Sequence, residues 1–187
     1  MLKDRYNRIH DYLRLSITDN CNFRCSYCMP DEKMSFLKQQ LLMSPEEIFD
    51  ISKIFVQLGV NKIRLTGGEP LAQPNCIPLL TALCDAGYHV SLETSGALDI
   101  SPVDTRVSRI VDIKTPSSKE EQRNLIANYA LLNAHDQIKF VIGDRQDYDW
   151  SCGFLQQHNL AQSGATIWFS PAFAIEGHIG LPTLARD

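Results

Sequence analysis

The stretch SPEEIFDISKIFVQLGVNKIRLTGGEP, residues 44–70, places a helix and a strand in succession. Ser44 is followed by a proline and then, three positions after itself, by Glu47, which is the capping box that begins a helix. Gly59 ends this helix, and residues 61–66 form the next strand. An amphipathic helix that leads directly into a strand is the repeating unit of α/β folds. The apolar residues of the helix share one face, namely Ile48, Ile51, Ile54, Phe55 and Leu58.

The same alternation continues on both sides of this stretch. Such alternation favours a parallel sheet with helical crossovers, so the predicted fold class is α/β. Six strands are too few for an eight-strand barrel, and we expect a partial (β/α)6 barrel, with a doubly wound sheet as the alternative. Strands are predicted at residues 13–17, 61–66, 88–93, 109–114, 137–142 and 166–169, and helices at residues 44–59, 77–86, 119–132 and 146–158.

We expect residues 1–171 to form one core domain. Residues 29–43 are a mixed connection whose order would depend on a bound ligand. Residues 172–187 show no clear period, and no structure is assigned to this tail.

The composition is that of an ordinary globular protein. With 44% hydrophobic and 21% charged residues among 187, the chain can bury a sizeable core. A formal charge of -4 offers no general basic surface for nucleic acid or a membrane. No apolar run approaches the roughly 20 residues of a membrane span, and the charged first residues lack the apolar core of a signal peptide. We therefore expect a soluble cytoplasmic protein that binds neither nucleic acid nor membrane.

Three of the six cysteines lie within eight positions, at Cys21, Cys25 and Cys28. In a reducing compartment such crowding favours a metal or cluster over disulfides. A cubane iron–sulfur cluster with full thiolate ligation uses four cysteines. A C-x3-C-x2-C loop can therefore bind three irons and leave the fourth open to another ligand. The alternatives are unligated thiols and a zinc site completed by Cys76, Cys84 or a histidine, although zinc ligands usually come as two C-x2-C pairs.

A second motif, residues 66–70 with the sequence Thr-Gly-Gly-Glu-Pro, follows a predicted strand directly. Two successive glycines let backbone groups approach a ligand more closely than side chains would allow. By itself a Gly-Gly turn after a strand is more often only a turn. Its place one strand after the cysteine loop favours a ligand site.

Polar residues also follow the next two predicted strands. Glu93, Thr94 and Ser95 come after the third strand, and Asp112 and Lys114 close the fourth. In α/β barrels the C-terminal strand ends share one face, where active sites lie. We therefore expect these residues to gather with the cysteine loop and the Gly-Gly turn. For Asp112 and Lys114 the alternative is a surface salt bridge.

Several other residues favour structural roles. Trp150 and Trp168 lie in apolar surroundings and are predicted in the core. Cys76, Cys84 and Cys152 are predicted to be small buried apolar side chains. The histidines show no metal spacing and are expected in loops or at the surface, at His10, His89, His135, His158 and His178.

The cysteine loop and the Gly-Gly-Glu-Pro segment resemble the motifs of the radical S-adenosylmethionine (SAM) superfamily. The resemblance implies a [4Fe–4S] cluster on Cys21, Cys25 and Cys28. It also implies that the amino and carboxylate groups of SAM ligate the open iron, with the Gly-Gly-Glu-Pro segment at the amino group. The residues it places at or near SAM are Gly67, Gly68, Glu69, Thr94, Ser95, Asp112 and Lys114.

Residues 4–71 resemble GTP 3',8-cyclase of molybdenum cofactor biosynthesis. The matching segments are YLRLSITDNCNFRCSYCMP at residues 12–30 and GVNKIRLTGG at residues 59–68. In that family the residues that match Arg14, Lys62 and Arg64 contact GTP, and the one that matches Tyr27 contacts SAM. Cations suit a polyphosphate. The alternative is that these arginines only solvate strand edges.

Residues 66–171 resemble instead 7-carboxy-7-deazaguanine synthase of queuosine biosynthesis. The two resemblances meet in a Thr-Gly-Gly-Glu-Pro-Leu segment that both families share, so the sequence resembles a mosaic joined at a common motif. The matching segments are GGEPLAQPNCIPLL at 67–80, CDAGY at 84–88, SLETSGA at 91–97, RIVDIKTP at 109–116 and DQIKFVI at 136–142.

Neither family pattern is complete. The second cysteine cluster with which the cyclases bind the purine of GTP has no counterpart here, and the synthases' Leu-Gln-Gly-Glu segment is missing. The synthases also carry an Asp-Thr pair whose threonine helps bind magnesium, and Met29-Pro30 occupies that place. Magnesium is therefore doubtful, and the residues from about 172 onward resemble neither family.

Together the resemblances imply a radical SAM enzyme of the carbon–nitrogen lyase type. The first expectation is conversion of 6-carboxy-tetrahydropterin to 7-carboxy-7-deazaguanine, with Thr66 at the substrate. The alternatives are GTP cyclisation carried by Arg14, Lys62 and Arg64, and an inactive cluster-binding mosaic. The implied partners are a small pterin or purine substrate and a flavodoxin or ferredoxin electron donor. A homodimer is left open.

Overall fold

The computed structural model describes residues 2–29 and 35–172. Within them the chain forms two compact units. The first holds the described parts of Met1–Asn22, Phe36–Thr94 and Pro102–Arg109, and the second holds those of Phe23–Ser35, Ser95–Ser101 and Ile110–Asp187. One core domain over residues 1–171 stays a prediction. Residues 30–34 of the expected connection, and residues 173–187 of the expected tail with His178, lie outside the described residues.

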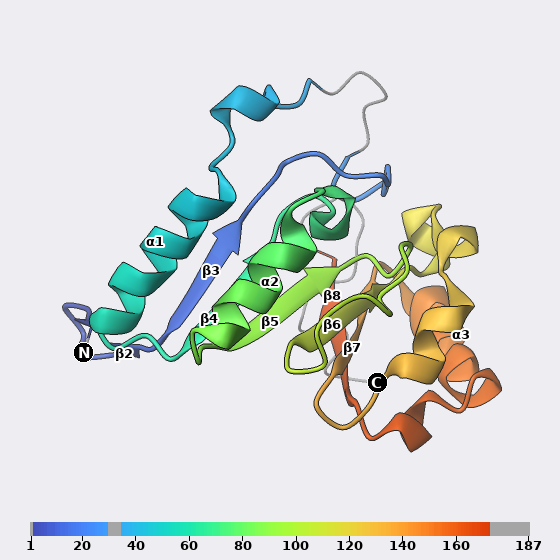
Figure 1. The fold of residues 1–187 in the computed structure, drawn as a ribbon. Helices are drawn as coiled ribbons and strands as arrows, with labels where there is room; N and C mark the ends of the chain where they lie inside the picture. The colour runs from blue at the N-terminus through green and yellow to red at the C-terminus, as the bar shows by residue number, and fades with distance from the viewer. Residues whose placement is uncertain (1, 30–34, 173–187) are drawn as a thin grey trace. The chain divides into compact units, whose positions relative to one another are not determined.

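The first unit is built on three parallel strands, β3 (Tyr12–Ser16), β4 (Lys62–Thr66) and β5 (His89–Thr94). Two helices, α1 (Pro45–Gln57) and α2 (Cys76–Asp85), lie along the same face of these strands (Figure 1). A short antiparallel hairpin of β1 (Leu2–Lys3) and β2 (Ile9–His10) comes before β3. The 3-10 helices of the unit are η1 (Gln39–Leu41) and η2 (Pro70–Ala72).

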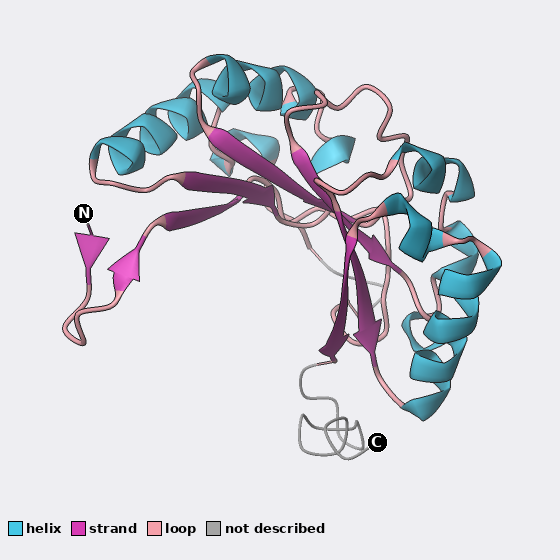
Figure 2. Cartoon of the chain, turned by 90° about the horizontal axis from the view of Figure 1, so that it is seen from below, coloured by secondary structure: helices cyan, strands magenta, loops and turns pink. Residues whose placement is uncertain are grey.

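The alternation of side chains along β4 and β5 explains why this unit is layered. Ile63, Leu65 and Leu92 are fully buried, while Arg64 and Ser91 point to the other face and pair in register. Figure 2 shows both helices on one side of the strands. The predicted capping box begins α1, because Ser44 and Glu47 exchange backbone-to-side-chain hydrogen bonds of 2.7 and 3.2 Å.

The second unit also contains parallel strands. β6 (Ser108–Ile113) contributes its last four residues, and it pairs with β7 (Gln137–Ile142), which pairs with β8 (Thr166–Pro171). α3 (Arg145–Gln157) packs here, with the ring of Tyr148 on that of Phe169. The 3-10 helices are η3 (Pro116–Ser118), η4 (Glu121–Arg123), η5 (Ile126–Leu131) and η6 (Leu160–Ser163).

The order of the six main strands is that of the chain, β3-β4-β5-β6-β7-β8. A doubly wound sheet would instead reverse its strand order at a switch point, so that alternative is wrong. The expected α/β class, with a mostly parallel sheet of six strands, is confirmed. Across residues 2–29 and 35–172, none of the helices combines the length and the apolar character that crossing a membrane requires.

The helix predicted at residues 119–132 is wrong, because the segment forms the short 3-10 turns η4 and η5 instead. Asn124 exchanges two hydrogen bonds of 2.9 Å with the backbone of Lys114. Asn128 donates to the carbonyl oxygens of Gly96 and Leu98 over 2.9 and 2.8 Å. Both asparagine side chains thus bind the backbone of other segments, and this favours turns over a continuous helix.

Trp168 is also not the core residue that we expect from the sequence, since 52% of it is exposed. It lies on the face of β8 opposite to Phe169, which stacks on Phe140. Trp150 and Cys152 are only partly buried on α3, whereas the predicted burial of Cys76 and Cys84 is confirmed. His10, His89 and His135 are exposed as expected, and His158 is partly buried against Phe154.

Candidate functional site

The predicted site residues are divided between the two units. The first unit holds Arg14, Cys21, Lys62, Arg64, Thr66, Gly67, Gly68, Glu69 and Thr94. The second unit holds Cys25, Tyr27, Cys28, Ser95, Asp112 and Lys114.

The two glycines after β4 bring the chain into close contact with residues 18–20. The backbone amide of Glu69 donates to the carbonyl oxygen of Asn20 over 2.9 Å. A Cβ on Gly68 would lie 1.9 Å from that same oxygen, and Gly67 has a φ of +104°, which disfavours any other residue. Packing against the segment that precedes the cysteine loop therefore already requires both glycines, whatever ligand the turn also meets.

Glu69 is fully buried and connects the ends of β4 and β5. Its carboxylate oxygens accept from the hydroxyl of Thr94 over 2.9 and 3.0 Å, and one of them accepts from the amide of Leu71 over 3.0 Å. A buried carboxylate needs such donors, because it has left water. Burial, reinforced by the nearby Glu69 carboxylate, raises the pKa of Cys76 to about 12.

Arg14 forms an ion pair that the sequence prediction missed. Its guanidinium lies 2.8 Å from a carboxylate oxygen of Glu93, to which the hydroxyl of Thr66 also donates over 3.2 Å. Arg14 donates in turn to the Thr66 hydroxyl over 3.3 Å. Glu93 is among the residues expected at the site, and its contact with Arg14 could also have been inferred, since strand alternation places Glu93 on the same face as Ser91, which is paired with Arg64.

The other two predicted cations lie nearer the start of β4. Lys62 is the first residue of the strand, and the guanidinium of Arg64 stacks over the ring of Tyr12 at 5.1 Å from its centroid. Both cations border a shallow groove of about 600 Å³. Its lining consists of Asp11, Tyr12, Asn61, Lys62, Arg64 and His89.

In the second unit, Cys25 and Cys28 lie side by side in a tight turn. The amide of Cys28 donates to the carbonyl of Cys25 over 3.1 Å, and that of Met29 to the same oxygen over 2.8 Å. A hydrogen bond with the Cys28 thiol and burial together raise the pKa of Cys25, so without a metal this thiol is protonated. Ser26 anchors the turn to the backbone of Ser118 over 3.2 Å.

Asp112 and Lys114 form a buried ion pair close to this turn. The ammonium of Lys114 lies 3.0 Å from a carboxylate oxygen of Asp112, and only 9% of the lysine side chain is exposed. Burial alone would lower the pKa of Lys114, but the charge and hydrogen bond of Asp112, together with Tyr27 and Cys25, outweigh it, and the pKa is raised. The alternative of a surface salt bridge for these two residues is therefore wrong.

The rings of the cysteine turn enclose this ammonium. Lys114 Nζ lies 5.8 Å from the centroid of Phe23 and 6.0 Å from that of Tyr27. Burial raises the pKa of Tyr27, so the phenol stays protonated. The hydroxyl of Tyr27 and the Oδ1 atom of Asp112 are buried without a hydrogen-bond partner among the described residues. Such orphaned polar atoms are the kind that a ligand satisfies.

Lys139 is a further cation that sequence reasoning missed. It is in register with Asp112, and its ammonium lies 3.5 Å from the same carboxylate oxygen that Lys114 contacts. The available signal was the alternation of β7, in which Gln137, Lys139 and Val141 share one face.

Ser95 lies in a buried turn after β5. Its hydroxyl accepts from the amide of Ala97 over 3.5 Å, and Gly96 follows with a φ of +72°. Asn128 holds the carbonyl of Gly96, so η5 fixes the shape of this turn.

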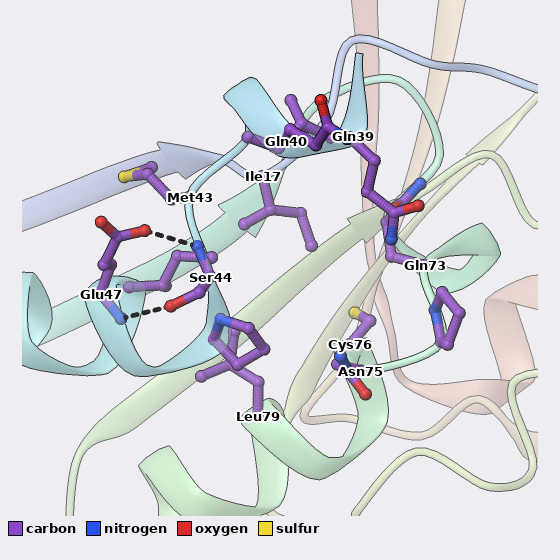
Figure 3. A pocket seen from close by; sticks show the side chains of 14 residues that line it. Ile17, Gln39, Gln40, Met43, Ser44, Glu47, Gln73, Asn75, Cys76 and Leu79 are labelled. Carbon is purple, nitrogen blue, oxygen red and sulfur yellow. Dashed lines mark hydrogen bonds between the residues drawn. The ribbon is translucent and has the colours of Figure 1, made fainter. Parts of the chain in front are cut away.

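A further pocket of about 410 Å³ lies in the first unit. Figure 3 shows Gln39, Gln73 and Cys76 among its lining residues, together with the capping box of Ser44 and Glu47. It opens where α1 and α2 begin, and none of its lining residues belongs to the predicted site.

The residues present fit an iron–sulfur cluster by the chemistry of their donors. Thiolates are the ligands that such clusters prefer, and the turn already brings the Cys25 and Cys28 thiols together. Binding would release their protons. Among the described residues, no three His, Cys, Asp or Glu side chains converge on one metal position.

The family model of the radical SAM superfamily matches residues 15–115 of the chain. The chain belongs to the radical SAM superfamily. This superfamily uses a [4Fe–4S] cluster and SAM, in agreement with the predicted cofactors. The matched range begins in β3 and ends just after Lys114, so it contains every predicted cofactor residue.

Two curated relatives carry the two resemblances stated above. The 7-carboxy-7-deazaguanine synthase of Koribacter versatilis is 40% identical over 154 residues, which are 82% of this chain and 66% of the relative. The GTP 3',8-cyclase of Listeria welshimeri is 45% identical over 83 residues, which are 44% of this chain and 25% of the relative. The chain thus spans about two thirds of the first relative and a quarter of the second.

Solved structures agree on the fold. SuiB of Streptococcus suis, crystallised with SAM, superposes with a TM-score of 0.70 at 14% identity and covers 94% of this chain and 45% of SuiB. At that identity the likeness shows the fold alone. Superfamily membership, together with relatives named as enzymes, supports an enzyme.

Proposed function

We propose that this chain is a 7-carboxy-7-deazaguanine synthase-like radical SAM enzyme that converts a carboxylated tetrahydropterin. Residues 1–171 would act as one core, and the reaction would be of the carbon–nitrogen lyase type in queuosine biosynthesis. The relative with the longer match, 82% of the chain, has this activity in its name. A reducing cytoplasm with a flavodoxin or ferredoxin donor suits the thiol ligands.

The observation that carries this choice is the Arg14–Glu93 ion pair. Arg14 belongs to the cyclase-like part of the mosaic and Glu93 to the synthase-like part, and their 2.8 Å contact balances the arginine's charge. A triphosphate would need that charge. Thr66 and Glu93 together offer a hydroxyl and a carboxylate, which suit the polar edge of a pterin ring.

The residues of the chain have distinct tasks in this proposal. Cys21, Cys25 and Cys28 would hold the cluster, which when bound supplies the electron that cleaves SAM to methionine and a 5'-deoxyadenosyl radical. Gly67, Gly68 and Glu69 would receive the methionine end of SAM. The other predicted SAM contacts are Tyr27, Thr94, Ser95, Asp112 and Lys114.

A second candidate function is GTP cyclisation, favoured by the groove that Lys62 and Arg64 border. The groove also presents His89, and two such cations suit a polyphosphate. The affinity of this groove for GTP should fall as salt is added, because salt screens the attraction between exposed charges.

The test is anaerobic incubation of the reconstituted chain with SAM, dithionite and each substrate, followed by mass spectrometry. The synthase proposal predicts 5'-deoxyadenosine and a deazaguanine product from the carboxylated tetrahydropterin only. Cys25→Ala should take up little iron and give neither product, whereas Cys152→Ala on α3 should match the parent. Product from GTP alone would establish the cyclase instead, and no SAM cleavage at all would leave the inactive mosaic.

A salt series separates the two substrates further. GTP binding that falls with added salt and is lost in Arg64→Ala would favour the cyclase. Binding of the carboxylated pterin that is equal in the parent and in Arg64→Ala would favour the synthase.

A further inference from the structure

The exposed indole of Trp168 lies in a row with two charged side chains of the second unit. The strand register pairs Asp112 of β6 with Lys139 of β7, and Lys139 with Trp168 of β8. Residues paired in this way point to the same face, about 4.8 Å apart from strand to strand. The contact of 3.5 Å between Lys139 and Asp112 confirms this direction for the first pair.

Trp168 is held in place although it is exposed. Its indole N–H donates to the side-chain oxygen of Gln137 over 3.1 Å, and Gln137 lies on the same face of β7. The neighbouring Phe169 points to the other face and stacks on Phe140 with centroids 5.6 Å apart. The ring of Trp168, 52% exposed, is therefore fixed before any ligand arrives, which lowers the entropy lost on binding.

The charge beside this ring suits an anion. The ammonium of Lys139 carries three hydrogens, so it can contact an anion in addition to Asp112. Its side chain is 23% exposed, whereas that of Lys114, on the other side of Asp112, is 9% exposed. Lys139 is thus the more accessible of the two cations that share this carboxylate. A flat ring that carries a carboxylate matches an indole next to an ammonium.

We propose that Trp168 and Lys139 form a stacking platform for a flat, carboxylate-bearing heterocycle. The ring lies on the indole, the carboxylate lies at Lys139, and the amide group of Gln137 contacts the ring edge. The identification of the heterocycle as a pterin rests on the proposed function. Asp112, at one end of this row, pairs with Lys114, whose ammonium lies 6.0 Å from the ring centroid of Tyr27 in the cysteine turn. The platform therefore adjoins residues expected around SAM.

Binding is tested with pterin-6-carboxylate, a stable fluorescent probe, on the reconstituted, SAM-loaded full chain. The chain has two tryptophans, so Trp150→Phe leaves Trp168 as the sole indole and serves as the parent. The probe should quench Trp168 fluorescence and gain fluorescence anisotropy on binding. Trp168→Leu should weaken binding by roughly tenfold or more, as the loss of a stacking ring does. Trp168→Tyr should retain most of the affinity.

Lys139→Met tests the charge. The parent should bind pterin-6-carboxylate roughly tenfold more tightly than plain pterin, since a bond to a charged group is worth more than a neutral one. In Lys139→Met that ratio should fall to about one. Lys53→Met, an exposed lysine of α1, is the matched control and should keep the parental ratio.

Three binding results would each overturn the platform: no binding of the probe to the parent, equal affinity in Trp168→Leu, or an unchanged ratio in Lys139→Met. SAM cleavage and turnover of the tetrahydropterin are measured on the same preparations. Parental turnover in Trp168→Leu would sink the platform and leave the proposed function standing. Probe binding that requires Trp168 and Lys139, without any turnover by the parent, would support the platform and overturn the proposed function.

Discussion

Two carboxylates of the predicted site, one in each unit, have different partners: Glu69 accepts from a hydroxyl and a backbone amide, whereas Asp112 pairs with two ammonium groups. Glu69 is fully buried between the Thr94 hydroxyl and the Leu71 amide. Asp112 meets the ammonium groups of Lys114 and Lys139 at 3.0 and 3.5 Å. Loss of a neutral donor costs about 1–3 kcal/mol, whereas loss of one member of a buried ion pair costs about 3–5 kcal/mol. Removing the charge of Asp112 should therefore destabilise the fold more than removing one neutral donor from Glu69.

The largest expected effect is that of Asp112→Asn. The ammonium of Lys114 stays buried and loses its carboxylate, so the free energy of unfolding should fall by about 3–5 kcal/mol in urea denaturation. The double variant Asp112→Leu with Lys114→Met removes both members of the more buried pair and leaves only the more exposed Lys139 without this partner, so it should cost much less than the single change. A loss below about 1 kcal/mol in Asp112→Asn would end the contrast between the units.

In the first unit the sensitive feature is backbone packing. Gly68→Ala places a Cβ 1.9 Å from the carbonyl oxygen of Asn20, so unfolding free energy should fall by about 1–3 kcal/mol. Gly153→Ala in α3 is the control, because no atom lies within 4 Å of the new Cβ, and it should stabilise by about 0.5–1 kcal/mol. Equal effects of the two variants would show that the turn can relax.

Alkaline pH should weaken the first unit through Cys76. Its pKa is raised to about 12 in the folded chain, against about 8.5 when unfolded, so the unfolded chain loses the proton first. The stabilisation that comes from the raised pKa of Cys76 is complete below about pH 8.5. Above that pH the free energy of unfolding falls by about 1.4 kcal/mol per pH unit as pH rises toward the folded pKa. Urea titrations at several alkaline pH values should show a shallower fall in Cys76→Ala than in Cys152→Ala. Parallel curves would contradict this account.

The smallest effect is expected for Arg14→Gln. The pair with Glu93 is the exposed counterpart of Asp112 and Lys114, because 54% of the arginine side chain is accessible. Such pairs are worth about 0–1 kcal/mol, and salt should reduce even that. A loss near that of Asp112→Asn, measured in the same urea series, would show that exposure does not distinguish the two pairs.

The regular elements were predictable where local signals agree with packing. The capping box at Ser44 and the alternation of β4 and β5 place α1 and the strands to within one or two residues. The helix at residues 119–132 failed because Asn124 and Asn128 bind the backbone of residues distant in sequence. The periodicity of apolar residues does not reveal hydrogen bonds to distant segments. It therefore cannot distinguish a helix from turns that such hydrogen bonds stabilise.

The site was predictable as a set of motifs but not as a set of contacts. Cys21, Cys25, Cys28 and the Gly-Gly turn follow from spacing. The partners of the predicted residues, Glu93 for Arg14 and Lys139 for Asp112, depend on strand register, which a single sequence does not specify. For the same reason the apolar residues next to Trp168 in the sequence predicted a buried side chain. In the structure Trp168 points to the face of β8 on which it is exposed.

The anchoring of Ser26 to the Ser117 and Ser118 carbonyls has a consequence for protein synthesis. These contacts join residues 91 or more positions apart, so the ribosome makes the cysteine turn long before its neighbours. At about 5–20 residues per second, Cys25 and Cys28 wait roughly 5–20 s for the segment that carries Lys114 and η3. During that interval the nascent turn lacks the ring-enclosed ammonium and the backbone acceptors of its folded state. On the proposed function, a cluster that requires the folded turn can be inserted only after residues 114–118 have been synthesised.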